Sequence, residues 1–412
     1  MDQNNSIGDY NNVNLDQNNS IVDYINSTED YIKVDVVWNI ANEGLEKSKI
    51  SFKIFLMILH NKLSKEELKK KLREEDFKRI TLSFYHYVII DNPNELRDAL
   101  YKQWNELNVL GRIYLANEGI NAQLSVPEAN FDAFKKYLYS LELFKNVPFK
   151  IAVEDDGKSF YKLIVRVKNK IVADGLNDAT FDVTNVGKHL TAKEFNDAIA
   201  DPDTVLVDMR NHYESEVGKF EGAITPDADT FKQELPMVLD LIKDKKDKKL
   251  VLYCTGGIRC EKASAYFKHQ GFNDVNQLYG GIIDYARQVK AEGLESKFIG
   301  KNFVFDERMG ERISEEIISV CHQCGQPSDR HVNCANDDCH LLFIQCESCA
   351  NSMDGCCSIE CQEIIQLPIE DQRKLRKGHK KEKAHAVYNK RLRPNLRELI
   401  LNGDINISKN NL

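Results

Sequence analysis

One cysteine of this chain stands where the sequence predicts a reactive thiol. The apolar run Leu250–Tyr253 is typical of a buried parallel strand, and it ends at Cys254. A tight loop then leads into a helix expected to start near Cys260, and the loop consists of Thr255, Gly256, Gly257 and Ile258. Backbone N–H groups of such a loop form an anion-binding nest and, with the helix dipole, favour thiolate over thiol. Arg259 adds positive charge nearby, so the pattern predicts a nucleophilic Cys254.

A second group of cysteines lies further along the chain. It consists of Cys321, Cys324, Cys334, Cys339, Cys346, Cys349, Cys356, Cys357 and Cys361. C-x-x-C pairs place two sulfurs on one tight knuckle, at the Zn–S distances of about 2.3 Å that tetrahedral zinc requires. Eight of these nine thiolates fill two Cys₄ zinc sites, and spacing does not tell which of Cys356 and Cys357 is a ligand. We expect this zinc to be structural, because the module has too few apolar residues to fold alone.

Other uses of these cysteines stay open. His322, His331 or His340 could replace a cysteine at one ligand position. An iron–sulfur cluster is the sharper alternative, although the paired C-x-x-C spacing is more typical of zinc ribbons. A disulfide framework is not expected, because the eleven cysteines occur in a chain without an export signal, which predicts a reducing compartment.

The charge of the chain is unevenly distributed. Its formal net charge is −8, yet eleven Lys and Arg oppose a single acid, Glu382, between Arg373 and Arg397. A dense run of cations neutralises phosphates, so we predict that this basic tail contacts RNA. The residues assigned to RNA binding are Arg373, Lys374, Arg376, Lys377, Lys380 and Lys381. A solvated tail that only keeps the protein soluble is the alternative.

Length and composition bound the class of protein. A chain of 412 residues exceeds what one hydrophobic core usually supports, which predicts an α/β protein of several domains. No apolar run approaches the roughly 20 residues of a transmembrane helix. We therefore expect a cytoplasmic protein without a membrane partner.

The first part of the chain contains an internal repeat, DQNNSIGDY at residues 2–10 and DQNNSIVDY at residues 16–24. Because such Asn-rich sequence buries too little apolar surface to offset the entropy of ordering, residues 1–56 are predicted to be a disordered extension, or to precede the true start of translation. A lead-in helix is expected within residues 57–80, where Ser64 is followed by Glu66 and Glu67, either of which could complete a helix-start signature.

Four further segments follow. Residues 81–180 alternate strand-like runs with helical stretches in the order of a ferredoxin-like α+β domain. Polar Asn117, Glu118, Gly119 and Asn121 interrupt an apolar strand pair there, and both a hairpin turn and a binding site explain them. Residues 195–294 read as an α/β domain with a parallel sheet. A Cys-rich module at 300–365 and the basic tail at 366–412 complete the chain.

The loop around Cys254 resembles the active site of rhodanese-like sulfurtransferase domains. Cys254 to Arg259 reads C-x-x-G-x-R, and Asp208 and Arg210 look like the D-x-R of that family. The resemblance implies that Cys254 carries a persulfide or attacks an electrophile, with Arg259, Asp208 and Arg210 in the catalytic site. Cys260 is a candidate resolving thiol, or a small residue at the start of the helix.

A narrower resemblance covers most of the chain after about Met57. Four runs resemble the bacterial tRNA uridine hydroxylases that contain a rhodanese-like domain, namely LANEGINAQLSVP at 115–127, DDGKSF at 155–160, CTGGIRCEKASAY at 254–266 and GKNFVFDERMGERIS at 300–314. The resemblance implies an oxidoreductase that uses molecular oxygen to convert the wobble uridine in the anticodon loop of tRNA to 5-hydroxyuridine. The electron donor is not identified, because no H-x-D iron triad, flavin fingerprint or haem attachment motif occurs.

Two other functions compete with this one. A sulfurtransferase would pass sulfur from a Cys254 persulfide to an acceptor, and the active-site loop alone allows it. A non-catalytic RNA-binding adaptor is disfavoured by the intact nucleophile loop with Arg259. For the hydroxylase, our working mechanism is that the Cys254 thiolate adds to C6 of the uracil ring, which makes C5 enolate-like and reactive toward oxygen or a peroxide.

Overall fold

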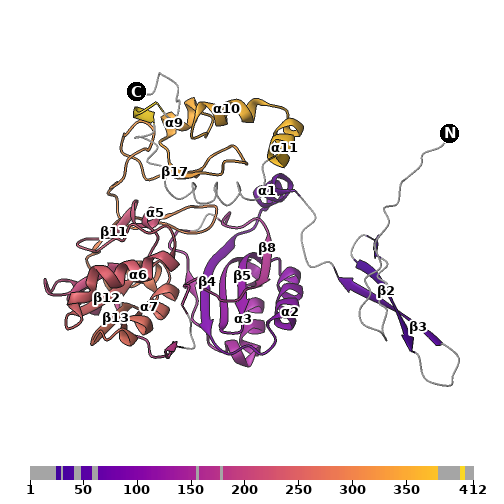
Figure 1. The fold of residues 1–412 in the computed structure, drawn as a ribbon, viewed down its shortest axis with the longest axis horizontal. Coiled ribbons are helices and arrows are strands. Elements are labelled where there is room, and N and C mark those ends of the chain that lie inside the picture. Colours follow the sequence, from indigo (N-terminus) through magenta and orange to yellow (C-terminus); the bar gives the residue numbers. More distant parts are fainter. Residues whose placement is uncertain are drawn as a thin grey trace. The chain divides into compact units, whose positions relative to one another are not determined.

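The structure is a computed structural model that describes residues 25–28, 31–40, 48–57, 64–154, 157–176, 180–378 and 400–403. The chain divides into two compact units, Met1–Lys62 and Leu63–Leu412 (Figure 1). Within the described residues, no helix combines the length and the apolar character that crossing a membrane requires.

The first unit contains a three-stranded antiparallel sheet in place of the disordered extension expected for residues 1–56. Strands β1 (Ile25–Thr28), β2 (Tyr31–Ile40) and β3 (Ser48–Met57) lie in that order, and β2 pairs with β3 from Tyr31↔Met57 to Ile40↔Ser48. The sequences of β2 and β3 are rich in β-branched and aromatic residues, which favour strands. The expected disorder was based on the composition of the Asn-rich repeat that precedes these strands. The repeat itself, at residues 2–10 and 16–24, lies outside the described residues.

The second unit begins with the expected lead-in helix, α1 (Lys65–Glu74), whose capping box joins Ser64 and Glu67. A five-stranded sheet follows in the order β7-β4-β6-β5-β8. Its elements along the chain are β4 (Arg79–Tyr87), α2 (Pro93–Glu106), β5 (Leu110–Ala116), β6 (Gly119–Pro127), α3 (Phe131–Ser140), β7 (Lys150–Ile151) and β8 (Leu163–Val167). The first six form the expected ferredoxin-like βαββαβ pattern, and β8 extends the sheet by pairing parallel to β5.

The two faces of this sheet differ in character, because side chains alternate along each strand. One face packs against α2 and α3, and Trp104 of α2 and Phe134 of α3 are fully buried with their rings 5.4 Å apart. The other face carries polar and aromatic side chains that the register aligns in rows across β4, β6 and β5. We call this the polar sheet face, and it consists of Ser83, Tyr85, Arg112, Tyr114, Asn121 and Gln123.

The predicted parallel sheet is present in the next domain, in the order β10-β12-β13-β9. Its elements are β9 (Lys188–Leu190), α4 (Ala192–Ile199), β10 (Val205–Asp208), α5 (His212–Ser215), α6 (Phe231–Ile242), β12 (Lys249–Tyr253), α7 (Ile258–His269), β13 (Asp274–Leu278) and α8 (Gly281–Glu292).

Helices cover both faces of this sheet. Leu250 and Leu252 of β12 pack into the apolar cluster that contains residues of α6 and α7, whereas Val251 and Tyr253 pack into the cluster that contains residues of α4 and α8. The central strand is therefore buried on both sides, as its continuous apolar sequence predicts. Its carboxyl end, where Cys254 follows, is held rigidly by both layers.

The remaining strands and helices belong to a small sheet and to the Cys-rich module. β11 (Gly218–Phe220), β14 (Phe298–Asn302) and β15 (Glu311–Arg312) form an antiparallel sheet. The module contains β16 (His331–Asn333), β17 (Leu342–Ile344), α9 (Glu347–Ser352) and α10 (Ile359–Gln366), and α11 (Ile369–Gly378) follows it. Apart from cysteines, its buried apolar cluster holds only Leu341, Phe343, Met353 and Ile400, which is few for an independent core.

Candidate active site

The loop after β12 folds around the sulfur of Cys254. Gly257 is the N-cap of α7 and adopts a left-handed conformation with φ +95°. Its backbone N–H donates to the Sγ of Cys254 at 3.1 Å. A Cβ atom at Gly257 would lie 2.8 Å from the hydroxyl oxygen of Tyr85, so glycine is required both by the backbone angle and by this close approach. The predicted anion-binding loop is therefore formed at a helix N-terminus.

The surroundings of Cys254 stabilise its thiolate. Burial by itself would raise the pKa of this fully buried thiol, but a hydrogen bond from Cys260, the positive charge of Arg259 and backbone N–H groups at the start of α7 lower the pKa to about 6. The same burial, with the neighbouring Cys254, raises the pKa of Cys260 well above its usual value. Near neutral pH one thiolate thus accepts a hydrogen bond from one thiol.

Arg259 is fixed by Glu214 on α5. Its Nη1 and Nη2 atoms lie 2.6 and 2.8 Å from the two carboxylate oxygens of Glu214, in a buried bidentate pair. Thr255 donates to the same carboxylate at 3.2 Å. This arrangement holds the guanidinium beside the loop, where it lowers the pKa of Cys254.

Asp208 and Arg210, which the sequence assigned to the catalytic site, lie outside the cavity over Cys254. Both are fully buried, and they form a bidentate pair with distances of 2.8 and 2.7 Å. Arg210 also donates to the carbonyl of Gly218 at 2.6 Å, and neither residue lines the cavity that Cys254 faces. The pair connects the end of β10 with β11, and a buried pair of this kind fixes the chain segments that it joins. Asp208 and Arg210 therefore position these two segments.

A cavity of about 460 Å³ lies over the Cys254 loop, and the ferredoxin-like domain, the parallel-sheet domain and the segment between β14 and β15 all line it. The parallel-sheet domain contributes Cys254, Thr255, Gly256, Ile258 and Arg259, whereas the ferredoxin-like domain contributes its polar sheet face and Lys150. A volume of this size is in the range of small-molecule sites. The loop that the sequence identified therefore forms only one side of the site.

The polar run at residues 117–121 is mostly structural. Glu118 accepts hydrogen bonds from the backbone of Ile171 and from Lys262 of α7, both at 2.8 Å, so it connects the two domains that form the cavity. Asn117 donates to the carbonyl of Ile90, and Asn121 donates to that of Ile171. Of this run, Asn121 also lines the cavity. The hairpin turn is present between β5 and β6, and a binding role for Asn121 stays a prediction.

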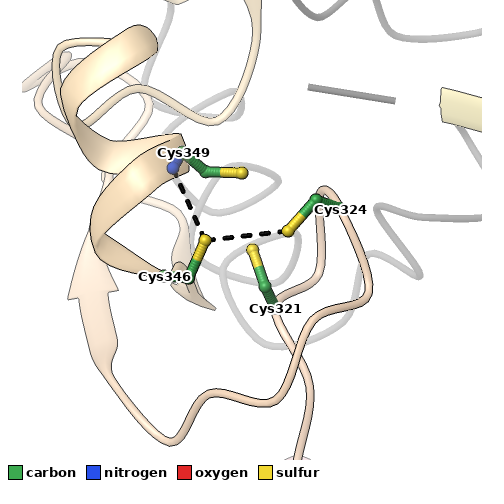
Figure 2. Close-up of side chains that lie close together, drawn as sticks. All are labelled: Cys321, Cys324, Cys346 and Cys349. Carbon is green, nitrogen blue, oxygen red and sulfur yellow. Dashed lines mark hydrogen bonds between the residues drawn. The ribbon is translucent and has the colours of Figure 1, made fainter. Parts of the chain in front are cut away.

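The nine clustered cysteines divide into two groups of four. Within each group the sulfur atoms all lie within 4.8 Å of one another, and the groups are Cys321, Cys324, Cys346 and Cys349, and Cys334, Cys339, Cys357 and Cys361. Figure 2 shows the four side chains of the first group pointing toward one another, with Cys346 and Cys349 at the start of α9. Cys356 is outside both groups, so the geometry selects Cys357 of the adjacent pair.

The three candidate histidines have other neighbours. The side chain of His322 pairs with Glu216 at 2.7 Å, and that of His340 with Asp337 at 3.6 Å. His331 is buried against the ring of Phe303, and this burial lowers its pKa to about 4. None of the three belongs to either group of four, so among the described residues both candidate metal-binding groups contain cysteine only.

The residues assigned to RNA binding are only partly described. Arg373, Lys374, Arg376 and Lys377 belong to α11, and Lys380 and Lys381 lie outside the described residues. Arg376 pairs with Asp337 at 3.2 Å and Lys374 pairs with Asp371 at 2.9 Å. Arg373 is exposed.

Three family models match successive parts of the chain. A UPF0176 acylphosphatase-like domain matches residues 79–171, a rhodanese-like domain matches residues 191–288, and a rhodanese C-terminal domain matches residues 299–362. The tRNA uridine(34) hydroxylase of Leptospira interrogans is 59% identical over 341 residues, which cover 83% of this chain and 93% of the relative. Those of Enterobacter sp. strain 638 and Pectobacterium atrosepticum are 56% and 55% identical over 81% of this chain and 95% and 94% of their own lengths.

The chain belongs to the tRNA uridine(34) hydroxylase family. The expected resemblance, the ferredoxin-like and rhodanese-like domains and the parallel sheet are all confirmed. In this member of the family, all three matched domains contribute to the lining of the cavity over Cys254, and the third also contains all nine clustered cysteines.

Proposed function

We propose that this protein hydroxylates the wobble uridine of tRNA at C5, with molecular oxygen as co-substrate, to give 5-hydroxyuridine. The observation that carries the proposal is a stabilised Cys254 thiolate in a cavity that the acylphosphatase-like domain completes. Chemistry on a base requires that the base leave its stack and enter a pocket, and this cavity has the volume for one nucleoside. The proposed substrate site is the anticodon loop, where the bases are unpaired.

The Cys254 thiolate supplies the nucleophile of the proposed mechanism. It adds to C6 of the uracil, the C5=C6 electron pair moves toward O4, and C5 becomes a carbon nucleophile that reacts with oxygen or a peroxide. With molecular oxygen, one oxygen atom becomes the hydroxyl group on C5, and two electrons and two protons from a donor reduce the other to water. Loss of the C5 proton then breaks the S–C6 bond and releases the Cys254 thiolate. Arg259 and Cys260 keep Cys254 ionised before the addition.

Several surfaces support RNA as the substrate. The polar sheet face places Tyr85 and Tyr114 in one cross-strand row with Asn121 between them, so aromatic rings and an amide share the cavity. Flat rings stack on unpaired bases, and amides pair with base edges. Arg373 and the basic segment after it are proposed to neutralise the tRNA backbone.

We infer that each group of four cysteines holds one structural zinc ion. Tetrahedral zinc with bonds of about 2.3 Å places its sulfur ligands about 3.8 Å apart. The sulfur atoms of Cys324 and Cys346 are 3.6 Å apart, and Cys357 lies 3.7 Å from both Cys339 and Cys361. These short separations suit four thiolates on one ion better than a cluster in which each thiolate binds a different iron. The zinc would stabilise the module and take no part in the reaction.

The cytoplasm is the proposed location. All eleven cysteines are free thiols in the structure, and the ligand sets need thiolates, which a reducing compartment maintains. The tRNA substrate is found in the same compartment.

The function is tested by mass spectrometry of tRNA nucleosides from cells that lack the gene. We expect 5-hydroxyuridine and nucleosides derived from it to disappear, and to return with the wild-type gene but not with Cys254→Ser. Unchanged wobble uridines in the deletion strain would refute the proposal.

The rhodanese-type sulfurtransferase is the second candidate, and one observation favours it. The backbone N–H of Gly257 and those at the start of α7 point at the Cys254 sulfur, an arrangement that would also hold a persulfide. Loss of a thiolated nucleoside from the deletion strain, with 5-hydroxyuridine unchanged, would support the sulfurtransferase over the hydroxylase.

A further inference from the structure

The cavity over Cys254 contains a buried cation for which the described residues provide no hydrogen-bond acceptor and no ion-pair partner. Lys150, on the short edge strand β7, is 8% exposed and lines the cavity. Its Nζ lies 4.3 Å from the centroid of the Tyr85 ring. Among the described residues, no hydrogen bond and no ion pair reaches its ammonium group. Lysine is almost never this buried unless it is paired, because removing the charge from water is costly.

The other cations of the cavity have different surroundings. Arg259 is paired with Glu214, and Arg308 is paired with Asp306 at 2.6 Å. Arg112 is exposed, which suits contact with a phosphate of the RNA backbone. Lys150 is therefore the buried cavity cation that forms no ion pair with any of the described residues.

Lys150 lies beside the nucleophile loop. A Cβ atom built on Gly256 would be 3.8 Å from Cδ of Lys150, so the lysine side chain lies next to the loop that contains Cys254. The neighbouring strand pairs Ser83 with Lys150, which places the lysine at the end of a polar cross-strand row. A base that presents C6 to the sulfur would thus have its carbonyl edge within reach of this side chain.

The charged groups around Lys150 come from every element near it. Burial lowers its pKa, whereas Asp284 of α8, the Cys254 thiolate and Glu261 of α7 oppose that shift. Tyr85 of β4 contributes its ring face and donates its own hydroxyl proton to Glu261 at 3.0 Å. A lysine in these surroundings gives up a proton, or a strong hydrogen bond, more readily than an exposed one.

We propose that Lys150 binds O4 of the target uracil and stabilises the enolate that forms when Cys254 adds to C6. This rests on the function and mechanism proposed above. In the step, the S–C6 bond forms, the C5=C6 π bond breaks, and its electron pair moves through C4 to O4. The ammonium group of Lys150 donates a hydrogen bond to that oxygen, and no oxidant is consumed. Lys150 then acts as the donor of an oxyanion site, and its charge is buried beside the nucleophile loop before the substrate binds.

Addition to C6 can be measured without oxygen or an electron donor. The enolate takes a deuteron from heavy water at C5, loses the original proton and releases the thiolate, so the base exchanges its C5 hydrogen. The experiment incubates full-length protein with unmodified tRNA in D₂O under anaerobic conditions. Mass spectrometry of the anticodon-loop fragment then reports deuterium at the wobble uridine.

We expect exchange with wild type, none with Cys254→Ser, and a rate lower by about 100-fold with Lys150→Met, as for loss of one oxyanion donor. Lys150→Arg keeps the charge and should restore part of the rate. Lys135→Met is the matched control, because Lys135 also lies over a tyrosine ring, that of Tyr139, but is exposed and outside the cavity. Binding of tRNA should change less than about threefold with Lys150→Met, since the enolate forms only after binding.

Three results would overturn the assignment. Exchange by Lys150→Met within about threefold of wild type would remove Lys150 from the step. A loss of exchange matched by an equal loss of tRNA affinity would make Lys150 a phosphate contact. Absence of exchange with wild type would refute the enolate itself. The proposed function is tested separately by the nucleoside analysis of cells. If 5-hydroxyuridine is present only with an intact Cys254, hydroxylation is supported whichever of these three results is obtained.

Discussion

Replacing Cys260 tests whether its thiol keeps Cys254 ionised. The structure lowers the pKa of Cys254 to about 6, with the hydrogen bond from Cys260 as the largest contribution opposing burial. A hydrogen bond to a charged group contributes about 1.5–3 kcal/mol, which corresponds to about one to two units of pKa. Cys260→Ala should therefore move the pKa of Cys254 upward to about 7–8. Because Cys260 is fully buried and small, alanine should leave the fold intact.

The assay is the rate at which iodoacetamide alkylates Cys254 as a function of pH, read from the Cys254 peptide by mass spectrometry. At about pH 6.5, a thiol with a pKa of 6 is about three-quarters thiolate, and one with a pKa of 7–8 is between about one-quarter and 3% thiolate. Alkylation of Cys260→Ala should thus be about 3- to 25-fold slower at that pH and approach the wild-type rate above about pH 9.

Cys260→Ser is the matched control, because its hydroxyl can still donate, and its profile should remain close to that of wild type. An unchanged midpoint in Cys260→Ala would show that the loop amides and Arg259 suffice without Cys260. A wild-type midpoint near the ordinary cysteine value would contradict the stabilised thiolate itself.

Three other changes probe the site and its supports. Gly257→Ala should abolish modification and cost about 1–3 kcal/mol of strain, because its Cβ would meet the Tyr85 hydroxyl at a left-handed backbone position. Adding Tyr85→Phe should recover part of the stability, and equal melting temperatures of Gly257→Ala and wild type would contradict this. Glu118→Gln should lower the free energy of unfolding by about 1.5–3 kcal/mol in urea melts, because it weakens the contact with buried Lys262; an unchanged midpoint would refute the connection between the domains. Elemental analysis should find two zinc ions in wild type and in Cys356→Ser but one in Cys346→Ser, and zinc loss from Cys356→Ser would contradict the ligand sets.

The sequence predicts the nucleophile loop well because that part of the site is contiguous in the chain. A buried strand, a Thr-Gly-Gly turn and a helix start determine where Cys254 lies and why it ionises. The other side of the cavity is different. Lys150 and Tyr85 reach it only because β7 and β4 are neighbours in a sheet of another domain, and this domain contact has no local signal. The alternation of polar residues at 121 and 123 in β6 was the available hint.

Spacing also left the cysteine ligands undecided. Cys356 and Cys357 are adjacent, so their sequence distances to each of the other cysteines differ by only one residue. Only the path of the folded chain shows which of the two belongs to the group. The turn before α10 directs Cys357 toward Cys339 and Cys361 and leaves Cys356 outside the group. The sheet in residues 25–57 was missed for another reason, since the polar repeat ahead of it dominated the composition of that segment.

Oxygen-isotope labelling tests the central claim most directly. Cells that lack the chromosomal gene and carry either wild type or Cys254→Ser are grown under ¹⁸O₂, and the wobble nucleosides of their tRNA are weighed by mass spectrometry. We expect 5-hydroxyuridine from wild-type cells to carry one ¹⁸O atom, and Cys254→Ser cells to contain none of this nucleoside. An oxygen atom that comes from water, or 5-hydroxyuridine that persists in Cys254→Ser cells, would contradict the proposed hydroxylation.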